Sequence, residues 1–371
     1  MLLIVCSVLS LLIANLPAGN MYVHYWETDL LIKPMHFWIN DVLMSVFFLL
    51  VGLEIEREMQ VGELRNLKNS MLPISAAIGG MLIPALFHFI FNFGLPTQDG
   101  MGIPMATDIA FSLAILSVLG KRVPISLKIF LTALAIIDDL GSILVIALFY
   151  SGDISYFDLL VSLFIFLVLM ILNRKKIDNL WIYFSLGVIM WIFMYRSGIH
   201  PTISGVMLAF AIPFSGKKRK TLSEDLQHIL HKPVAFLILP IFALANTAII
   251  IPDSWKSDLF SHNSLGIMTG LVLGKPIGIF LFSWLSLAIG VASIPRDLKL
   301  SHLFWTGLIA GIGFTMSIFI TLLAFNDAEL IDSSKMAVMI GSLIAGCGGL
   351  IALSIVLPKS KKEEQPVPAS S

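Results

Sequence analysis

The chain has 371 residues, of which 57% are hydrophobic and 13% are charged, and its formal net charge is zero. Soluble domains carry about 25% charged residues, so a soluble fold of this length has no interior large enough for so much apolar surface. The balanced charge also disfavours a nucleic-acid partner, which would select a basic surface. The two cysteines, Cys6 and Cys347, lie far apart in apolar segments, which disfavours a structural disulfide and a Cys-ligated metal site.

Long stretches without Asp, Glu, Lys or Arg indicate membrane-spanning helices. A helix needs about 20 apolar residues to cross about 30 Å of hydrocarbon, and backbone groups cannot stay unpaired in lipid. The polar and apolar alternation of a membrane β-barrel is missing from these stretches. We therefore predict an all-α polytopic membrane protein with about twelve transmembrane helices. Their spans are 2–16, 39–58, 70–92, 103–119, 126–150, 156–172, 180–195, 200–214, 233–251, 264–290, 302–325 and 335–357.

We expect residues 1–357 to form one transmembrane domain and the polar tail at 358–371 to be disordered in the cytoplasm. The first segment follows Met1 directly, with no basic residue before it and no cleavage site, so a signal peptide is not expected. We interpret it as a helix that lacks its first turn, as it would if the start codon lies upstream.

The basic residues predict the orientation of the chain. Eighteen of the 24 Lys and Arg residues fall in one set of alternate connections, and four fall in the other set. Cytoplasmic connections carry the excess of Lys and Arg. Both termini are therefore expected in the cytoplasm, which agrees with an even number of spans. The basic run at 217–220 is interpreted as part of this orientation signal rather than as a lipid or regulator site.

Asp138 and Asp139 lie in the middle of an apolar segment, where a charge costs about 3 kcal/mol on insertion scales. Neighbouring helix positions differ by about 100°, so the two carboxylates can serve one cavity with separate partners. Burial and a second carboxylate both favour the protonated form. The pair is expected to hold a proton or, once ionised, a small hard cation, for which oxygen ligands are suited. The alternative is a pair of acids that only form hydrogen bonds between helices.

Asp108 follows Pro104, which removes a backbone donor, and Thr107, whose hydroxyl can pair with the freed backbone groups. This stretch predicts an interrupted helix. An acid at such a break can neutralise the helix-end dipoles or bind an ion, and the sequence leaves both roles open.

A second interruption is predicted within 302–325, where Gly311 and Gly313 precede Thr315 and Ser317. Two broken helices in opposite halves of a chain indicate a binding site at the membrane midplane of a transporter built from inverted repeats.

Lys275 lies about ten residues from either end of its segment, too deep for its amine to reach the interface. A lysine at this depth must pair with an acid or lose its proton, and the pair Asp138 and Asp139 supplies a candidate. Lys128 lies near a cytoplasmic end and is interpreted as a lysine that extends to the interface.

Charged residues also end the segment at 39–58, where they are expected at the cytoplasmic mouth. They are Glu54, Glu56, Arg57 and Glu58. The sequence leaves open whether they form a solvated helix end or a vestibule that attracts cations. Three histidines near segment ends are interpreted as hydrogen-bonded interfacial residues. They are His88, His200 and His231.

Six motifs between residues 38 and 357 resemble those of the NhaA family of bacterial Na+/H+ antiporters. They are Trp-Ile-Asn-Asp at 38–41, Phe-Phe-Leu-Leu-Val-Gly-Leu-Glu at 47–54, Ala-Thr-Asp-Ile-Ala-Phe at 106–111, Ala-Ile-Ile-Asp-Asp-Leu-Gly at 135–141, Gly-Lys-Pro-Ile-Gly at 274–278 and Gly-Ile-Gly-Phe-Thr-Met-Ser-Ile-Phe at 311–319. The resemblance implies a twelve-helix fold in which the fourth and eleventh segments are interrupted and cross. It also implies a secondary transporter of the bacterial inner membrane that exports Na+ or Li+ in exchange for protons, with no cofactor.

The family pattern assigns roles to the buried ionisable residues. It makes Asp139 the principal cation and proton site, with Asp138 as its partner in holding Na+ or Li+ transiently. Asp138 is expected to pair with Lys275, while Thr107 and Asp108 lie where the broken helices cross.

The resemblance also implies regulation and assembly. Three residues match positions tied to the pH response, namely Glu54, Glu58 and His231. A homodimer is implied, with contacts from the outward loop at 17–37. The chain departs from the family pattern at Glu56, which is commonly Lys, and at 294–299, which puts the pH set-point in doubt.

Together these residues predict exchange by competition, in which a metal ion and protons take turns on Asp138 and Asp139. Because Lys275 can also exchange a proton, more protons than Na+ are expected to move per cycle, which makes exchange sensitive to voltage. Three rivals stay open at this point: a cotransporter of organic anions with Lys275 as the substrate's partner, an intramembrane aspartyl protease using Asp108 and Asp139, and a passive channel. Anion uptake, peptide cleavage or conductance would identify them.

Overall fold

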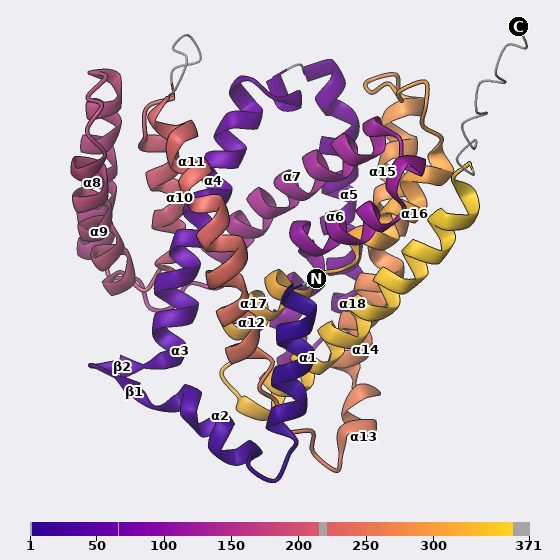
Figure 1. Cartoon of the computed structure of the whole chain (residues 1–371), viewed down its shortest axis with the longest axis horizontal. Coiled ribbons are helices and arrows are strands. Elements are labelled where there is room, and N and C mark those ends of the chain that lie inside the picture. The colour runs from indigo at the N-terminus through magenta and orange to yellow at the C-terminus, as the bar shows by residue number, and fades with distance from the viewer. Residues whose placement is uncertain (1, 66, 215–220, 359–371) are drawn as a thin grey trace, which may run out of the picture.

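The structure is a computed structural model that describes residues 2–65, 67–214 and 221–358, most of which are helical (Figure 1). The first part contains α1 (Leu2–Ala14), α2 (Gly19–Glu27), β1 (Asp29–Leu30), β2 (Lys33–Pro34), α3 (Met35–Phe37), the π-helical turn η1 (Trp38–Leu43), α4 (Met44–Gln60), the 3₁₀ turn η2 (Glu63–Arg65) and α5 (Leu67–Asn92). The middle part contains the 3₁₀ helix η3 (Pro96–Met105), α6 (Ile109–Val118), the 3₁₀ turn η4 (Gly120–Arg122), α7 (Ile125–Phe149), α8 (Tyr156–Arg174), α9 (Leu180–Arg196) and α10 (Thr202–Ala211).

The last part begins with α11 (Leu222–Pro233), the π-helical turn η5 (Val234–Ile238), α12 (Leu239–Asn246), α13 (Trp255–Leu259), α14 (His262–Thr269) and the π-helical turn η6 (Gly270–Gly274). It ends with α15 (Lys275–Ala288), α16 (Leu300–Ala310), α17 (Phe314–Ala324) and α18 (Ala328–Val356).

Within the described residues, seven continuous helices are long and apolar enough to cross a membrane, and the number rises to as many as ten if each bent pair counts as one span. The shorter apolar helices α9 and α10 account for two more of the predicted segments. Every predicted segment therefore has a helical counterpart in the described part of the chain. The all-α polytopic class is confirmed, whereas the inverted-repeat relation stays a prediction.

Charged helix ends explain where the predicted boundaries are wrong. Helix α11 begins at Leu222 rather than at 233, because Thr221 and Glu224 form a capping box there. Helix α18 begins at Ala328 rather than at 335, because Asp327 caps its first turn. Apolar runs cannot reveal helix ends that are amphipathic or capped by charged residues.

The predicted outward loop at 17–37 is folded. The chain turns by 115° from α1 into α2 and then forms the antiparallel hairpin of β1 and β2, with Asp29 opposite Pro34 and Leu30 opposite Lys33. The two residues at its tip, Leu31 and Ile32, are 83% and 89% exposed. The predicted tail at 358–371 lies outside the described residues beyond position 358, as does the basic run at 217–220.

The two predicted helix breaks meet. Helices η3 and α6 form a 46° bend, and α16 and α17 form a 54° bend. The amide of Asp108 donates to the carbonyl of Ile312 at 2.7 Å, and the Ser317 hydroxyl donates to the carbonyl of Ile103 at 2.6 Å. Each break thus satisfies backbone groups that the other exposes, as the absence of water in a bilayer requires. The two crossing interrupted helices, in the fourth and eleventh segments, are confirmed.

Helices α5 and α15 touch through glycines. A Cβ on Gly79 would lie 2.2 Å from the carbonyl oxygen of Gly278, and one on Gly278 would lie 2.1 Å from the oxygen of Gly79. Small residues allow such close approach of helices in membranes. Because α15 begins at Lys275, this contact fixes the position of that lysine relative to α5.

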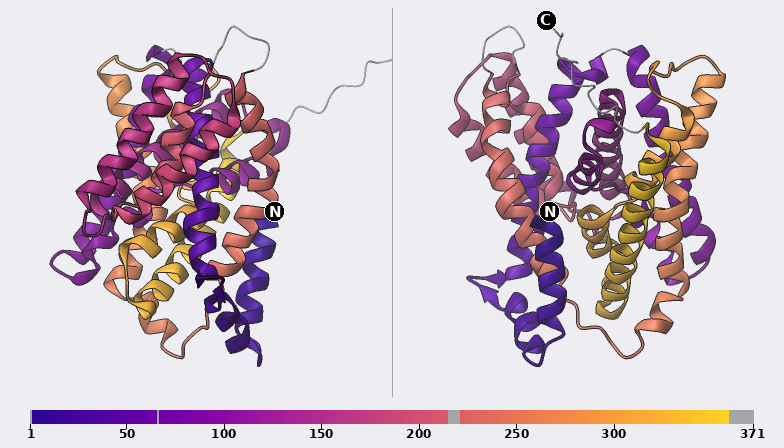
Figure 2. Two further views of the ribbon diagram at one scale, coloured as in Figure 1. Left: turned by 90° about the vertical axis from the view of Figure 1, so that its left-hand side faces the viewer. Right: turned by 45° about the vertical axis from the view of Figure 1, so that its right-hand side comes forward.

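Two apolar clusters surround this arrangement. The larger one encloses the crossing and the middle of α7. The smaller one lies between α4, α8, α9 and α10, on the side where α8 and α9 stand at the edge of the molecule (Figures 1 and 2). The crossing is therefore shielded by helices on the side of α8 and α9.

The glycine contact predicts the effect of adding one methyl group. Gly278→Ala should destabilise the protein by about 1–3 kcal/mol through overpacking, although alanine is the better helix former by about 1 kcal/mol. Thermal unfolding of the purified protein in detergent measures this. Gly152→Ala is the control, because the nearest atom to its added Cβ would lie 3.7 Å away. Equal melting temperatures for the two variants would contradict the prediction.

Candidate functional site

Helix α7 carries the two adjacent aspartates at its middle. Asp138 is fully buried and Asp139 is 2% exposed. Their carboxylates have different surroundings, as expected for neighbouring positions on a helix.

Asp138 is held by residues from two other parts of the chain. Its Oδ2 atom accepts hydrogen bonds from the Lys275 amine and, at 2.6 Å, from the Thr107 hydroxyl. Lys275 is also fully buried, so this is an ion pair without access to solvent. A buried lysine and a buried aspartate neutralise each other, and removing one leaves the other as an uncompensated charge.

The Thr107 hydroxyl has two acceptors. It lies 2.6 Å from Asp138 Oδ2 and 2.8 Å from the carbonyl oxygen of Ala310. A hydroxyl has one proton to donate. The two acceptors therefore share this proton in a bifurcated hydrogen bond. Thr107 thus joins Asp138 to the end of α16.

Asp139 lacks a comparable partner. Its Oδ1 atom is buried without a hydrogen bond in the described part of the chain. The charged groups that act on it are three acids, Asp138, Asp108 and Glu54, and one base, Lys275. Lys275 already contacts Asp138. A carboxylate in this environment costs several kcal/mol unless a proton or a cation neutralises it.

Asp108 connects the two breaks in the helices. It caps α6 by accepting from the amide of Phe111 at 3.0 Å. Its second oxygen accepts from the amide of Thr315, at 3.2 Å, and from the Thr315 hydroxyl, both in the first turn of α17. One carboxylate therefore faces the positive ends of two helices. These contacts favour the dipole role, and ion binding by Asp108 stays a prediction.

Thr315 is the site residue that the sequence did not assign. It was recognised only as part of a helix break, because nothing in the sequence indicates that its hydroxyl faces Asp108. One sequence feature could have indicated it: Thr315 lies two residues after Gly313 in the second interrupted segment. This position places its amide and hydroxyl in the first turn of the following helix.

The acids predicted at the cytoplasmic mouth are not equivalent. Glu54 is half-buried on α4, lies within electrostatic reach of Arg57, Glu58 and His231, and also acts on Asp139. Glu58 contacts the Arg57 guanidinium at 3.1 Å. Glu54 is thus the member of this group whose charge acts on Asp139.

Glu56, the departure from the family pattern, is 7% exposed. It accepts from Gln60 at 3.3 Å and from Ser223 of α11 at 3.5 Å. Both donors are neutral, and the one from Ser223 joins α4 to α11 in the place where the family pattern has a cation.

With this geometry established, comparison with known proteins identifies the family. Residues 1–353 match the family described as Na+/H+ antiporter 1. The chain belongs to this family. It is therefore a transporter and not an enzyme, which removes the aspartyl-protease interpretation of Asp108 and Asp139.

Relatives of this antiporter cover nearly its whole length. The Na+/H+ antiporter NhaA of Flavobacterium psychrophilum is 55% identical over 355 residues, 96% of this chain and 92% of the relative. That of Dechloromonas aromatica is 55% identical over 95% of this chain and 92% of its own. That of Proteus mirabilis is 45% identical over 98% of this chain and 96% of its own.

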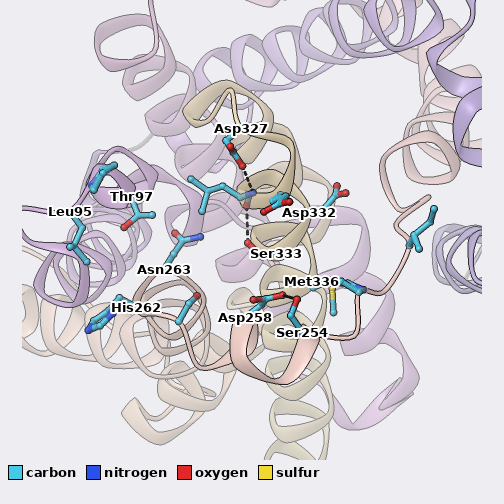
Figure 3. Close-up of a pocket in the computed structure, with 16 residues that line it drawn as sticks. Leu95, Thr97, Ser254, Asp258, His262, Asn263, Asp327, Asp332, Ser333 and Met336 are labelled. Atoms are coloured by element: carbon cyan, nitrogen blue, oxygen red, sulfur yellow. Dashed lines mark hydrogen bonds between the residues drawn. The ribbon is translucent and has the colours of Figure 1, made fainter.

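A cavity of about 690 Å³ lies elsewhere in the antiporter, where the start of η3 meets α13, α14 and the start of α18 (Figure 3). Three of its four acids have local partners: Asp327 accepts from the amide of Leu330 at 2.9 Å, Asp258 accepts from Ser254 at 2.8 Å, and Asp332 lies 3.5 Å from the Lys335 amine. None of the residues predicted for the site lines it. We therefore place the candidate site at α7 and not in this cavity.

A polar cluster joins helices beside this cavity. His88 Nε2 lies 3.1 Å from the Asn263 amide oxygen, and the Asn263 amide donates to Ser334 at 2.7 Å. His88 is hydrogen-bonded, as predicted, but it is fully buried. His200 Nδ1 lies 3.8 Å from a carboxylate oxygen of Asp41 and has no hydrogen bond within the described residues, so the hydrogen bond predicted for His200 is wrong at this nitrogen.

The buried ion pair predicts a non-additive pair of substitutions. Lys275→Met leaves Asp138 without its base and should destabilise the antiporter by about 3 kcal/mol, whereas Lys275→Met with Asp138→Asn should recover most of that loss. Thermal unfolding in detergent measures both. Lys128→Met is the control, since Lys128 is exposed. A double variant no more stable than the single one would contradict the pairing.

Proposed function

We propose that this Na+/H+ antiporter is a secondary transporter that works by competition for buried carboxylates. Na+ or Li+ and protons would take turns on Asp139, with Asp138 as its partner. One observation carries the proposal: the Asp139 carboxylate is 2% exposed, surrounded mainly by other acids, and has no hydrogen bond at Oδ1 within the described residues. Such a group must acquire a positive charge from outside the protein.

Obligatory exchange follows from the cost of the empty state. Loaded with protons, the site carries no net charge, and a bound cation contacts the carboxylates and neutralises one of them directly. Empty and doubly ionised, it carries a charge that the low-dielectric interior disfavours by several kcal/mol. Only the loaded forms would then switch between the inward-open and the outward-open state. Each Na+ ion that crosses in one direction therefore requires protons to cross in the other.

Lys275 and Thr107 support movement of more than one proton. A cation that engages Asp138 as well as Asp139 competes with the Lys275 amine for the same carboxylate. A lysine that loses its counter-ion in an apolar interior favours its neutral form. We infer that Lys275 releases its proton when Na+ binds and that exchange is electrogenic.

We further propose that the protein lies in the bacterial inner membrane with both termini in the cytoplasm. The α4–α5, α8–α9 and α15–α16 connections, which belong to the basic set, lie at one end of the molecule, and the β1–β2 hairpin and α13 lie at the other (Figure 1). The excess of basic residues supports the first end as cytoplasmic. Labelling of single cysteines from either side of sealed cells tests the orientation.

Assembly and pH response remain proposals as well. The exposed apolar tip formed by Leu31 and Ile32 supports a homodimer through the 17–37 segment, which cross-linking at position 32 tests.

The proximity of Glu54 to His231 and Glu58 supports a role for these three residues in the pH response. A shift of the activity profile along the pH axis in Glu54→Gln tests this role.

Removing the charge of Asp139 tests the central proposal. Asp139→Asn keeps the side-chain shape but cannot bind a proton and a cation in turn, so Na+-dependent proton movement should fall to background. Addition of Na+ to inverted membrane vesicles with a respiration-made pH gradient measures this, as does growth of a salt-sensitive bacterial strain at alkaline pH. Asp258→Asn, in the other cavity, should behave as wild type. Persistent sodium extrusion in Asp139→Asn would refute the proposal.

Electrogenic exchange predicts a voltage effect. An inside-negative potential should accelerate Na+ efflux from proteoliposomes without a pH gradient, because a net charge crossing 100 mV carries about 2.3 kcal/mol. A potassium gradient with valinomycin sets the potential, and radioactive sodium reports efflux. An efflux rate independent of potential would show one-for-one exchange instead.

A further inference from the structure

An apolar groove of about 320 Å³ lies between α1 and α18, and its floor is formed by the two broken helices. Helix α1 contributes Ile4, Val8 and Leu11, which are spaced as one helical face. Helix α18 contributes a second face that includes Leu343, Gly346 and Cys347. The groove is open at the side, since Val8 and Leu343 are 51% and 66% exposed.

The groove is bounded by a glycine on α18 and by a helix α1 that packs elsewhere. A Cβ on Gly346 would lie 2.9 Å from Ile115 of α6 and 3.3 Å from Ile312, the residue at the break of α16 and α17. The floor is therefore close to α18 here. Helix α1 does not fill the gap, because its opposite face packs on α12, where the Ser10 hydroxyl donates to the carbonyl of Leu244 at 2.6 Å.

The lining offers little to water. Its two hydroxyl groups each already make one hydrogen bond: Ser7 donates to the carbonyl of Leu3 at 2.8 Å, and Ser342 accepts from the amide of Phe314 at 3.2 Å. A water molecule needs about two to four polar partners. The groove therefore suits an apolar occupant.

The depth of the groove in the membrane indicates which apolar molecule can occupy it. Leu343 lies at the middle of α18, a membrane-spanning helix over Ala328–Val356, so the groove opens at the depth of the hydrocarbon. It is continuous with the exposed apolar residues Val5 and Ile344 on the lipid-facing sides of its two walls. An acyl chain is the material that reaches this surface from the bilayer.

We propose that this groove is a binding site for one acyl chain of a membrane phospholipid, which packs against the outside of the helix crossing. The floor residues Phe111 and Phe314 have ring centroids 4.7 Å apart. The amide of Phe111 donates to the carboxylate of Asp108, and the carbonyl of Ile312 accepts from the Asp108 amide. The bound chain thus contacts the residues that hold Asp108, without contacting the carboxylate.

Photo-cross-linking tests the site in the full-length protein. The antiporter is reconstituted into phosphatidylcholine and phosphatidylglycerol vesicles that contain phosphatidylcholine with a diazirine at the middle of one acyl chain, and adducts are mapped by peptide mass spectrometry. Adducts at 339–347 and 4–11 should be several-fold more frequent than at Leu82 and Leu86 of α5, which are 54% and 48% exposed. Adducts that follow exposure alone would overturn the proposal.

A matched pair of variants separates the groove from the general surface. Val8→Trp fills the groove and should abolish its adducts while leaving those on α5. Val5→Trp should change nothing, because Val5 is 52% exposed on the same helix but does not line the groove. Na+/H+ exchange in the same vesicles reports correct folding.

A second pair of variants, on α18, tests the groove independently in case Val8→Trp does not fold. Leu343→Trp should remove the groove adducts, and Ile344→Trp, at a site that is 50% exposed outside the groove, should not. In a Cys6→Ala background, Cys347 is the sole cysteine. Efficient cross-linking of two copies through Cys347 by a short bifunctional thiol reagent would show that a second copy covers the groove, and would overturn the proposal.

Discussion

The ion pair between Lys275 and Asp138 is the interaction on which the rest of the structure depends. Both groups are fully buried, so neither charge is tolerable without the other. Their pairing sets Asp139 apart, because the base nearest to it is already engaged. A chain with two bases at this position would neutralise both acids permanently and leave no place for a transported ion. The imbalance of charge is thus the functional feature, and the pair makes it stable.

The surrounding helices hold Lys275 and Thr107 beside Asp138. The glycine contact between α5 and α15 brings Lys275 to its position, and the crossing of the broken helices brings Thr107 to the same carboxylate. In both cases, backbone groups approach closely because side chains are absent or small. Polar groups in the bilayer are consequently satisfied by neighbours rather than by water.

Much of this arrangement could be predicted from the sequence, because a charge inside an apolar run is conspicuous. Asp138, Asp139 and Lys275 were identified in this way, and the Pro and Gly positions revealed both breaks. The partners could not be predicted by the same argument. Thr315 is a hydroxyl residue like many others, and only the fold brings it to Asp108. The starts of α11 and α18 were missed because polar residues begin them.

The contacts of Asp108 have a consequence for motion. Its two oxygens hold the first turns of α6 and α17, and its amide holds the break between α16 and α17. Neither half-helix can tilt by a small amount without disturbing the other. Movement at the crossing should therefore be concerted, with two preferred positions and a barrier between them, rather than a gradual bending of one element.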